Sequence, residues 1–313
     1  MQSDSQPKTI ITNEREIDWK FFFLTILDYK KFIIISTAII SLSAALFTLT
    51  IPNQYSASVL LQLTDESSQS TSASIGGAAG LASMAGITLG SGGNKAHYAD
   101  AVLRSKKFLS HIANFPGIRE NLTVANGFDS KTGKILYKKE FFDAEKRKWK
   151  KTDINGNLII PSDQDVVAAI KERMKVYVDF ETNFLTITFQ HFSPIFAYEF
   201  INLLEGQLNA MEREKDIMNS SRAIKFLNEQ LEETKQAGIQ NIIYQLIESQ
   251  LQTKMLANID EHYLIIPIDP AVIPEKKSFP FRRNIVIVVF FISLLISIIL
   301  VLLRHFYLRS SSQ

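Results

Sequence analysis

The chain has 313 residues, of which 46% are apolar, and its formal net charge is +2. A charge so close to zero creates no overall field for nucleic acid, so we expect no nucleic-acid partner. The absence of cysteine excludes disulfides and thiol chemistry, and it removes the soft ligands that many transition-metal sites use.

Two stretches, 32–51 and 284–303, each hold 20 residues without a charged side chain. That length crosses a hydrocarbon layer of about 30 Å, so we predict two transmembrane helices. Lys30 and Lys31 precede the first stretch, and arginines flank the second. Buried core helices are the alternative, but two such runs beside cations at opposite ends of the chain argue against it. The first run exceeds the apolar core of a signal peptide, about 7–15 residues, so we expect a retained anchor.

Positive charges close to the two stretches predict the orientation. The tails 1–31 and 304–313 both carry lysine or arginine, which places them in the cytoplasm. The segment between the spans then lies on the outer side, where Arg282 and Arg283 oppose the positive-inside trend. That trend weakens for long translocated segments.

The sequence pattern of residues 52–192 predicts an α+β base domain. Pro52 ends the first helix, and small or apolar residues then alternate with polar ones, as in a half-buried strand. The predicted elements are a strand at 55–63, helices at 100–113 and 163–174, and a β-hairpin formed by 175–180 and 184–190.

A long extended helical arm is predicted at 193–262. Ser193 and Pro194 suit a helix start, and no proline follows until Pro267. A continuous helix of about 65 residues at ~1.5 Å each would reach on the order of 100 Å, and it would need partner helices to bury its apolar stripe. The alternative is a helical hairpin broken near Gly238.

The segment 263–283 is rich in proline, which fixes φ and opposes helix. We therefore predict a stiff extended connector between the arm and the second span, with Pro270, Pro274 and Pro280 as its structural residues.

The insert 131–151 combines nine basic residues with aromatic ones. Such a mixture can contact sugars or anionic polymers. The candidate polysaccharide contacts are Lys138, Lys139, Arg147, Lys148 and Trp149. The simpler interpretation is a solvated hairpin whose aromatic rings pack inward.

No motif indicates catalysis. The glycine-rich stretch 67–93 is followed by Asn94, Lys95 and Ala96, so it lacks the G-K-[ST] ending of a phosphate-binding loop. The five histidines are scattered, and no nucleophile elbow is present. We predict no enzyme activity, no cofactor and no metal site.

In their order along the chain, several short motifs resemble the Wzz-type chain-length determinants, which are bacterial polysaccharide co-polymerases. They are Glu16-Ile-Asp, Pro52 with Tyr55-Ser-Ala, the small-residue stretch that ends at Gly93, Ser105-Lys-Lys-Phe-Leu, Lys148-Trp149, Asp269-Pro-Ala-Val-Ile-Pro-Glu-Lys and Pro280-Phe-Arg-Arg.

The resemblance implies an inner-membrane regulator that sets the modal length of lipopolysaccharide O-antigen or a related polymer. It also implies a periplasmic base domain, a homo-oligomeric ring, and as partners a Wzy-type polymerase, the growing polysaccharide and membrane lipid. The alternative function is a two-span adaptor of a polysaccharide export or efflux assembly.

Overall fold

The computed structural model describes residues 27–310, apart from 65–94, 153, 155 and 180 and the side chains of 305–310. The stretch 67–93 and most of the first tail therefore lie outside the described residues. The chain forms two compact units. Pro52–Pro280 is the sheet domain, and Met1–Ile51 with Phe281–Gln313 contains a pair of long helices.

The sheet domain is built on an antiparallel four-stranded sheet in the order β6-β7-β1-β8. The strands are β1 (Tyr55–Leu63), β6 (Met174–Val178), β7 (Phe184–His191) and β8 (Ile265–Asp269). The predicted strand at 55–63 and the predicted hairpin are confirmed. Strand β1 is an inner strand because β7 and β8 flank it. Its odd-numbered residues from Ala57 to Leu63 are buried.

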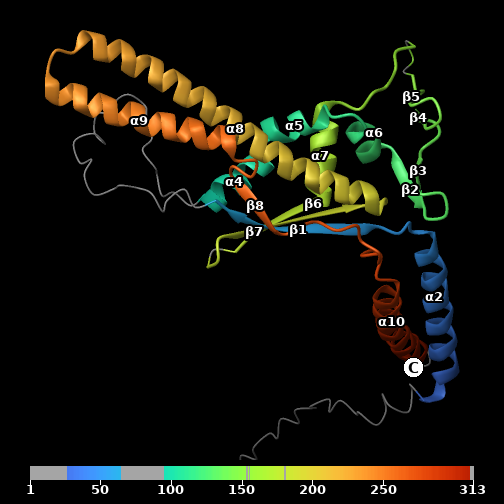
Figure 1. The fold of residues 1–313 in the computed structure, drawn as a ribbon. Helices are drawn as coiled ribbons and strands as arrows, with labels where there is room; N and C mark the ends of the chain where they lie inside the picture. Colours follow the sequence, from blue (N-terminus) through green and yellow to red (C-terminus); the bar gives the residue numbers. More distant parts are fainter. Residues whose placement is uncertain (1–26, 65–94, 153, 155, 180, 311–313) are drawn as a thin grey trace, which may run out of the picture. The chain divides into compact units, whose positions relative to one another are not determined.

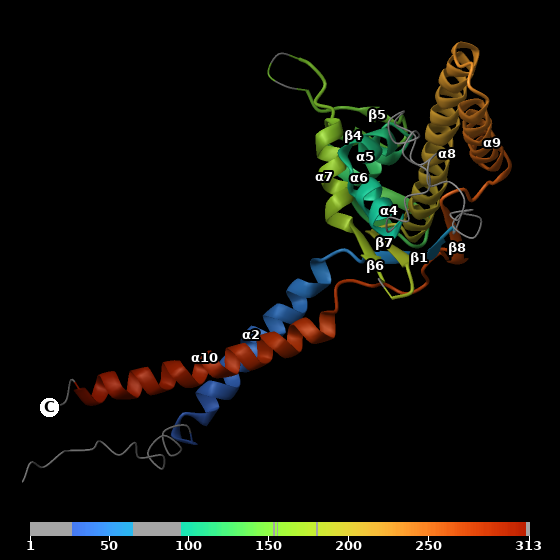
Figure 2. The ribbon, with the colours of Figure 1, turned by 90° about the vertical axis from the view of Figure 1, so that its left-hand side faces the viewer.

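Helices cover one face of this sheet (Figures 1 and 2). They are α4 (Lys95–Arg104), α5 (Lys106–Ala113), α6 (Ile118–Thr123), α7 (Asp163–Arg173) and the first half of α8 (Pro194–Glu233). Phe189 of β7 lies 4.1 Å from Phe200 of α8, centroid to centroid, and both side chains are fully buried. The core of the domain therefore consists of side chains buried between the sheet and these helices.

The predicted helix at 100–113 is two helices. Ser105 takes an extended backbone conformation, and its hydroxyl accepts a hydrogen bond from the Phe108 N–H. The serine is thus the N-cap of α5, which separates α5 from α4. Farther along, Ser162 and Asp165 form a capping box at the start of α7, as the predicted helix at 163–174 requires.

The arm is a helical hairpin and not one continuous rod. Helix α8 ends at Glu233, three residues follow, and α9 (Ala237–Ile259) returns beside it (Figure 1). Gly238 lies in the first turn of α9. Leu227 packs with Ile243 and Leu246 in a small second core. The reversal occurs because each helix then buries part of the other's apolar surface, which a single extended helix cannot do.

The predicted connector is partly a strand. Its first residues form β8, with Pro267 on the edge of the sheet, where a missing N–H is tolerated. Pro270 is exposed after the strand, Pro274 is half-buried and Pro280 is buried. Near its end, Ser278 and Phe279 donate backbone hydrogen bonds to the Gln54 carbonyl. The connector therefore combines a strand with irregular backbone, and it is hydrogen-bonded to the domain.

The second unit consists of α2 (Lys30–Thr50) and α10 (Arg282–Ser310), which pack along each other. Both are long and apolar enough to cross a membrane: windows of 18 residues within Lys30–Thr50 and Arg282–Arg304 reach mean hydropathies of 2.3 and 3.5. These two candidate spans near the termini fit a two-span membrane protein. Ile51 is extended because it precedes Pro52, which ends α2 as predicted.

Candidate functional site

The insert between α6 and α7 contains two short hairpins. Strands β2 (Ala125–Asp129) and β3 (Lys134–Tyr137) form the first, and β4 (Phe142–Asp143) and β5 (Lys148–Trp149) form the second. The second hairpin turns because the Asp143 carboxylate accepts hydrogen bonds from the N–H groups of Glu145 and Lys146. Its last turn residue, Arg147, is left-handed, with φ 49°.

The aromatic residues of the insert form a row that anchors the second hairpin. The ring centroids of Tyr137 and Phe142 lie 5.1 Å apart, and those of Phe142 and Trp149 lie 5.3 Å apart. Phe142 is only 4% exposed, whereas Trp149 is half-buried. The inward packing that we considered at the sequence level is therefore present, but Trp149 keeps part of its surface accessible.

An open cleft of about 380 Å³ lies between this hairpin and the turn that joins α5 to α6. Gly117 adopts φ 86° in that turn, a conformation that side-chain-bearing residues rarely adopt. The lining residues are Ala113, Asn114, Phe115, Pro116, Gly117, Arg119, Glu120, Arg147, Trp149 and Ile160. The cleft thus joins polar and charged groups to two aromatic rings.

The two arginines of the cleft differ in how they are held. Arg119 donates to the Pro161 carbonyl and pairs with Asp163 at 2.6 Å, so its guanidinium ties α6 to the start of α7. The Arg147 side chain is 75% exposed, and its Nη2 lies 4.0 Å from Glu120 Oε1, beyond hydrogen-bond length. Arg147 is therefore the cation that retains donors for a ligand.

Asn121 connects the insert to the core behind the cleft. Its side-chain oxygen accepts from the Tyr137 hydroxyl, and its backbone carbonyl lies 2.9 Å from His191 Nε2. His191 Nδ1 accepts a hydrogen bond from the Ser193 N–H, so the neutral ring donates through Nε2. Burial lowers the pKa of His191 to about 4, and the charge of Arg173 lowers it further.

The structure separates the five residues that we predicted as polysaccharide contacts. It brings Arg147 and Trp149 together in the cleft, while the exposed side chains of Lys138, Lys139 and Lys148 lie outside its lining. Sequence reasoning missed Arg119 and Glu120 because they come from a helix about thirty residues earlier. The only local signal near them was the turn-forming pair Pro116-Gly117.

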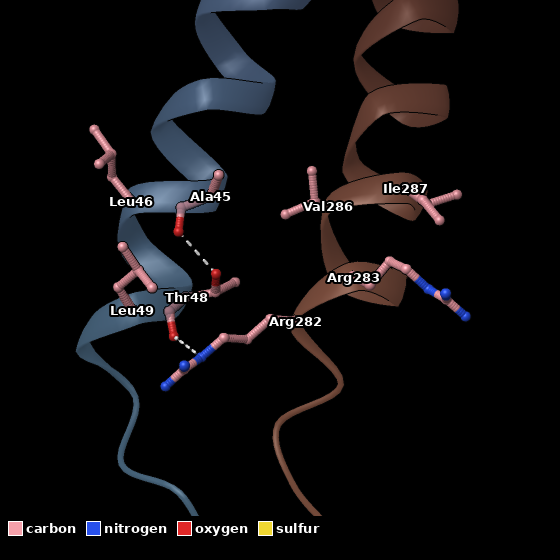
Figure 3. A pocket seen from close by; sticks show the side chains of 8 residues that line it. All are labelled: Ala45, Leu46, Thr48, Leu49, Arg282, Arg283, Val286 and Ile287. Atoms are coloured by element: carbon pink, nitrogen blue, oxygen red, sulfur yellow. Dashed lines mark hydrogen bonds between the residues drawn. The ribbon is translucent and has the colours of Figure 1, made fainter.

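The helix pair has its own polar contacts, well away in sequence from the cleft residues. Arg282, at the start of α10, donates from Nε to the Thr48 carbonyl at 3.1 Å and from Nη2 to the Ile51 carbonyl at 3.2 Å. Figure 3 shows Arg282 reaching α2 while Arg283 points away from it. Ser36 and Ser297 hydrogen-bond through their hydroxyls at 2.9 Å. The arginine caps carbonyls that the end of a helix leaves unpaired.

Beside Arg282, an apolar crevice of about 430 Å³ opens between the same two helices. Ala45 and Leu49 of α2 and Val286 and Ile287 of α10 contribute to its walls (Figure 3). The apolar part of these walls suits lipid chains or a neighbouring helix. Within the described ranges, no group of three or more His, Asp or Glu could hold a metal ion.

The two candidate spans fit a two-span membrane protein, and the α+β domain carries a polar cleft. Residues 15–114 match the family described as "Wzz: Chain length determinant protein". The match covers the first candidate span and strand β1, and over these residues it confirms the predicted resemblance to the chain-length determinants.

Solved structures and curated proteins give two further comparisons. A solved structure described as a full-length bacterial polysaccharide co-polymerase aligns with 94% of this chain and 98% of its own, at 11% sequence identity and a TM-score of 0.39. The comparison with curated proteins gives no match.

Proposed function

We propose that this protein regulates the chain length of a bacterial surface polysaccharide, such as lipopolysaccharide O-antigen, as a non-catalytic scaffold for a Wzy-type polymerase. The observation that carries the proposal is the family match over residues 15–114. The protein acts at the inner membrane, with both termini in the cytoplasm and Pro52–Pro280 in the periplasm.

The scaffold is a homo-oligomer. This part of the proposal is supported by apolar side chains on the arm that the described chain leaves exposed. Phe226 of α8 is 44% exposed, and Tyr244, Met255 and Ile259 of α9 are 56%, 61% and 77% exposed. Burial of apolar surface stabilises by about 25 cal/mol per Å², so neighbouring copies that cover this surface would be stabilised.

Cross-linking in membranes tests the assembly. Because the chain has no cysteine, Met255→Cys introduces a single reactive thiol in the arm. Oxidation or a short bifunctional reagent is expected to give species larger than a monomer. Lys131→Cys, in the exposed β2–β3 turn, is the control and should cross-link far less. Only monomers, both with Met255→Cys and with an amine-reactive reagent acting on the surface lysines of the full chain, would refute the oligomer.

The function itself is tested by removing the gene and restoring it. Gel separation of the surface polysaccharide should show that deletion redistributes the chain lengths while the polymer is still made. Re-expression of the full chain should restore the modal length. An unchanged banding pattern would refute regulation of length, and loss of all polymer together with co-purification of an outer-membrane channel would favour an export adaptor instead.

A further inference from the structure

We propose that the cleft between the α5–α6 turn and the β4–β5 hairpin binds a carboxylated sugar unit of a polysaccharide. This inference rests on the proposed role in polysaccharide assembly and names the chemistry that the protein would contact. The cleft volume of about 380 Å³ falls within the ~300–1,000 Å³ typical of small-ligand sites. Trp149 and Phe115 contribute rings, while Arg119, Glu120 and Arg147 contribute hydrogen-bonding groups.

The aromatic part of the cleft is held rigidly. Trp149 packs against buried Phe142, and Phe142 packs against Tyr137, whose hydroxyl donates to Asn121 Oδ1 at 2.5 Å. The accessible part of the indole is therefore positioned before a ligand arrives. An ordered, partly solvent-exposed ring is suited to the C–H face of a sugar. It offers contact area, and little side-chain entropy is lost when the sugar binds.

The charged part of the cleft favours an anion. Asp163 pairs with Arg119 at 2.6 Å. Arg147 pairs with Glu120 at 4.0 Å, which is beyond hydrogen-bond length, so Glu120 does not occupy the donors of that guanidinium. A planar guanidinium can bind a carboxylate through two parallel hydrogen bonds. The surrounding stretch 131–151 holds nine basic residues and three acidic ones, so the rim attracts an anion as well. Glu120 can accept hydrogen bonds from sugar hydroxyls.

The backbone at Arg147 supplies an independent argument. Its φ of 49° lies in the left-handed region, where glycine, asparagine and aspartate are the favoured residues. Glycine would suit the turn better, yet this position carries the exposed guanidinium that lines the cleft. The substitution Arg147→Gly therefore removes the charge while the turn stays compatible with the new residue.

The experiment uses the full chain in detergent with Trp19→Phe, which leaves Trp149 as the only tryptophan. We expect its fluorescence to change saturably on titration with galacturonate oligomers, and to change much less with neutral galactose oligomers of the same length. Binding should weaken as salt is raised, because the contact is between charges at a partly exposed site. Loss of a charge-assisted hydrogen bond in Arg147→Gly should raise the Kd at least about tenfold.

Lys148→Gln is the matched control, because it removes one positive charge from the same hairpin at an exposed position outside the cleft lining. Its Kd should change less than about twofold. Equal binding of the neutral oligomer, or equal losses in the two variants, would overturn the assignment of Arg147 to a carboxylate. No saturable change with either oligomer would overturn the site. Gel banding after gene deletion tests the proposed regulation of chain length separately. Failure of the binding experiment therefore does not imply failure of the proposed function, or the reverse.

Discussion

The side-chain amide of Asn209 pairs with both backbone groups of Ile265. Asn209 Nδ2 donates to the Ile265 carbonyl at 3.0 Å, and Oδ1 accepts from the Ile265 N–H at 2.9 Å. The same oxygen accepts from the Leu264 N–H at 2.9 Å. Asn209 is 4% exposed, so this contact inside the domain fixes the point at which the chain leaves the arm and joins the sheet as β8.

Replacing this amide should be costly. Asn209→Ala leaves three buried backbone groups without their partner, and each such group costs about 1–3 kcal/mol. We expect the free energy of unfolding to fall by about 3 kcal/mol, measured by thermal or denaturant unfolding of the purified chain. Asn258→Ala is the control, since that exposed amide bonds only to the Lys254 carbonyl of its own helix. Equal effects of the two substitutions would contradict the role of Asn209.

The hairpin of the arm depends on its small core. Leu227 is 3% exposed and packs with Ile243 and Leu246. Leu227→Ala should destabilise the α8–α9 contact by about 2–3 kcal/mol, because it removes buried methyl groups and leaves a cavity. Hydrogen exchange should then be faster in α9 than in the sheet. Met255→Ala, at an exposed position, should leave the exchange of the monomeric chain nearly unchanged, and a similar acceleration there would argue against this packing.

Stability should depend on pH through His191. The folded pKa of His191 is about 4 and the ordinary pKa of a histidine is 6.5, so the unfolded chain binds the proton more readily. The stability contributed by the neutral ring is present above pH 6.5 and is lost as the pH falls toward 4. At pH 5 the free energy of unfolding should be about 2 kcal/mol lower than well above pH 6.5. His191→Gln should flatten this part of the profile in unfolding measurements from pH 4 to pH 7, whereas an unchanged slope would assign the effect to other groups.

The cap at the end of α2 predicts that replacing Arg282 destabilises the helix pair more than replacing its neighbour Arg283. Arg282→Gln removes the guanidinium that donates to the Thr48 and Ile51 carbonyls, so the helix pair should lose about 1–2 kcal/mol. Arg283→Gln removes the same charge from the residue that points away from α2 (Figure 3). Unfolding of the two variants in mixed micelles compares them directly, and a larger loss for Arg283→Gln would contradict the cap.

Much of the architecture could be predicted from local sequence. The alternation from Tyr55 to Leu63 specified β1, because a strand buried on one face needs apolar residues at every second position. The proline after Ile51 marked the end of α2 for a similarly local reason. The two uncharged runs predicted α2 and α10 because crossing length and polarity are properties of the segment alone.

Only the tertiary structure decided which distant segments meet. The sequence left open whether the arm is one long helix or a hairpin broken near Gly238. The packing of Leu227 with Ile243 and Leu246 decides for the hairpin. Arg147 and Trp149 were two of the five candidate contacts predicted from composition, but Glu120 and Arg119 join them only because the insert folds back onto α6. Contacts between residues far apart in sequence depend on three-dimensional packing. Periodicity along the chain predicts helices, strands and their apolar faces, but it does not predict which of them meet.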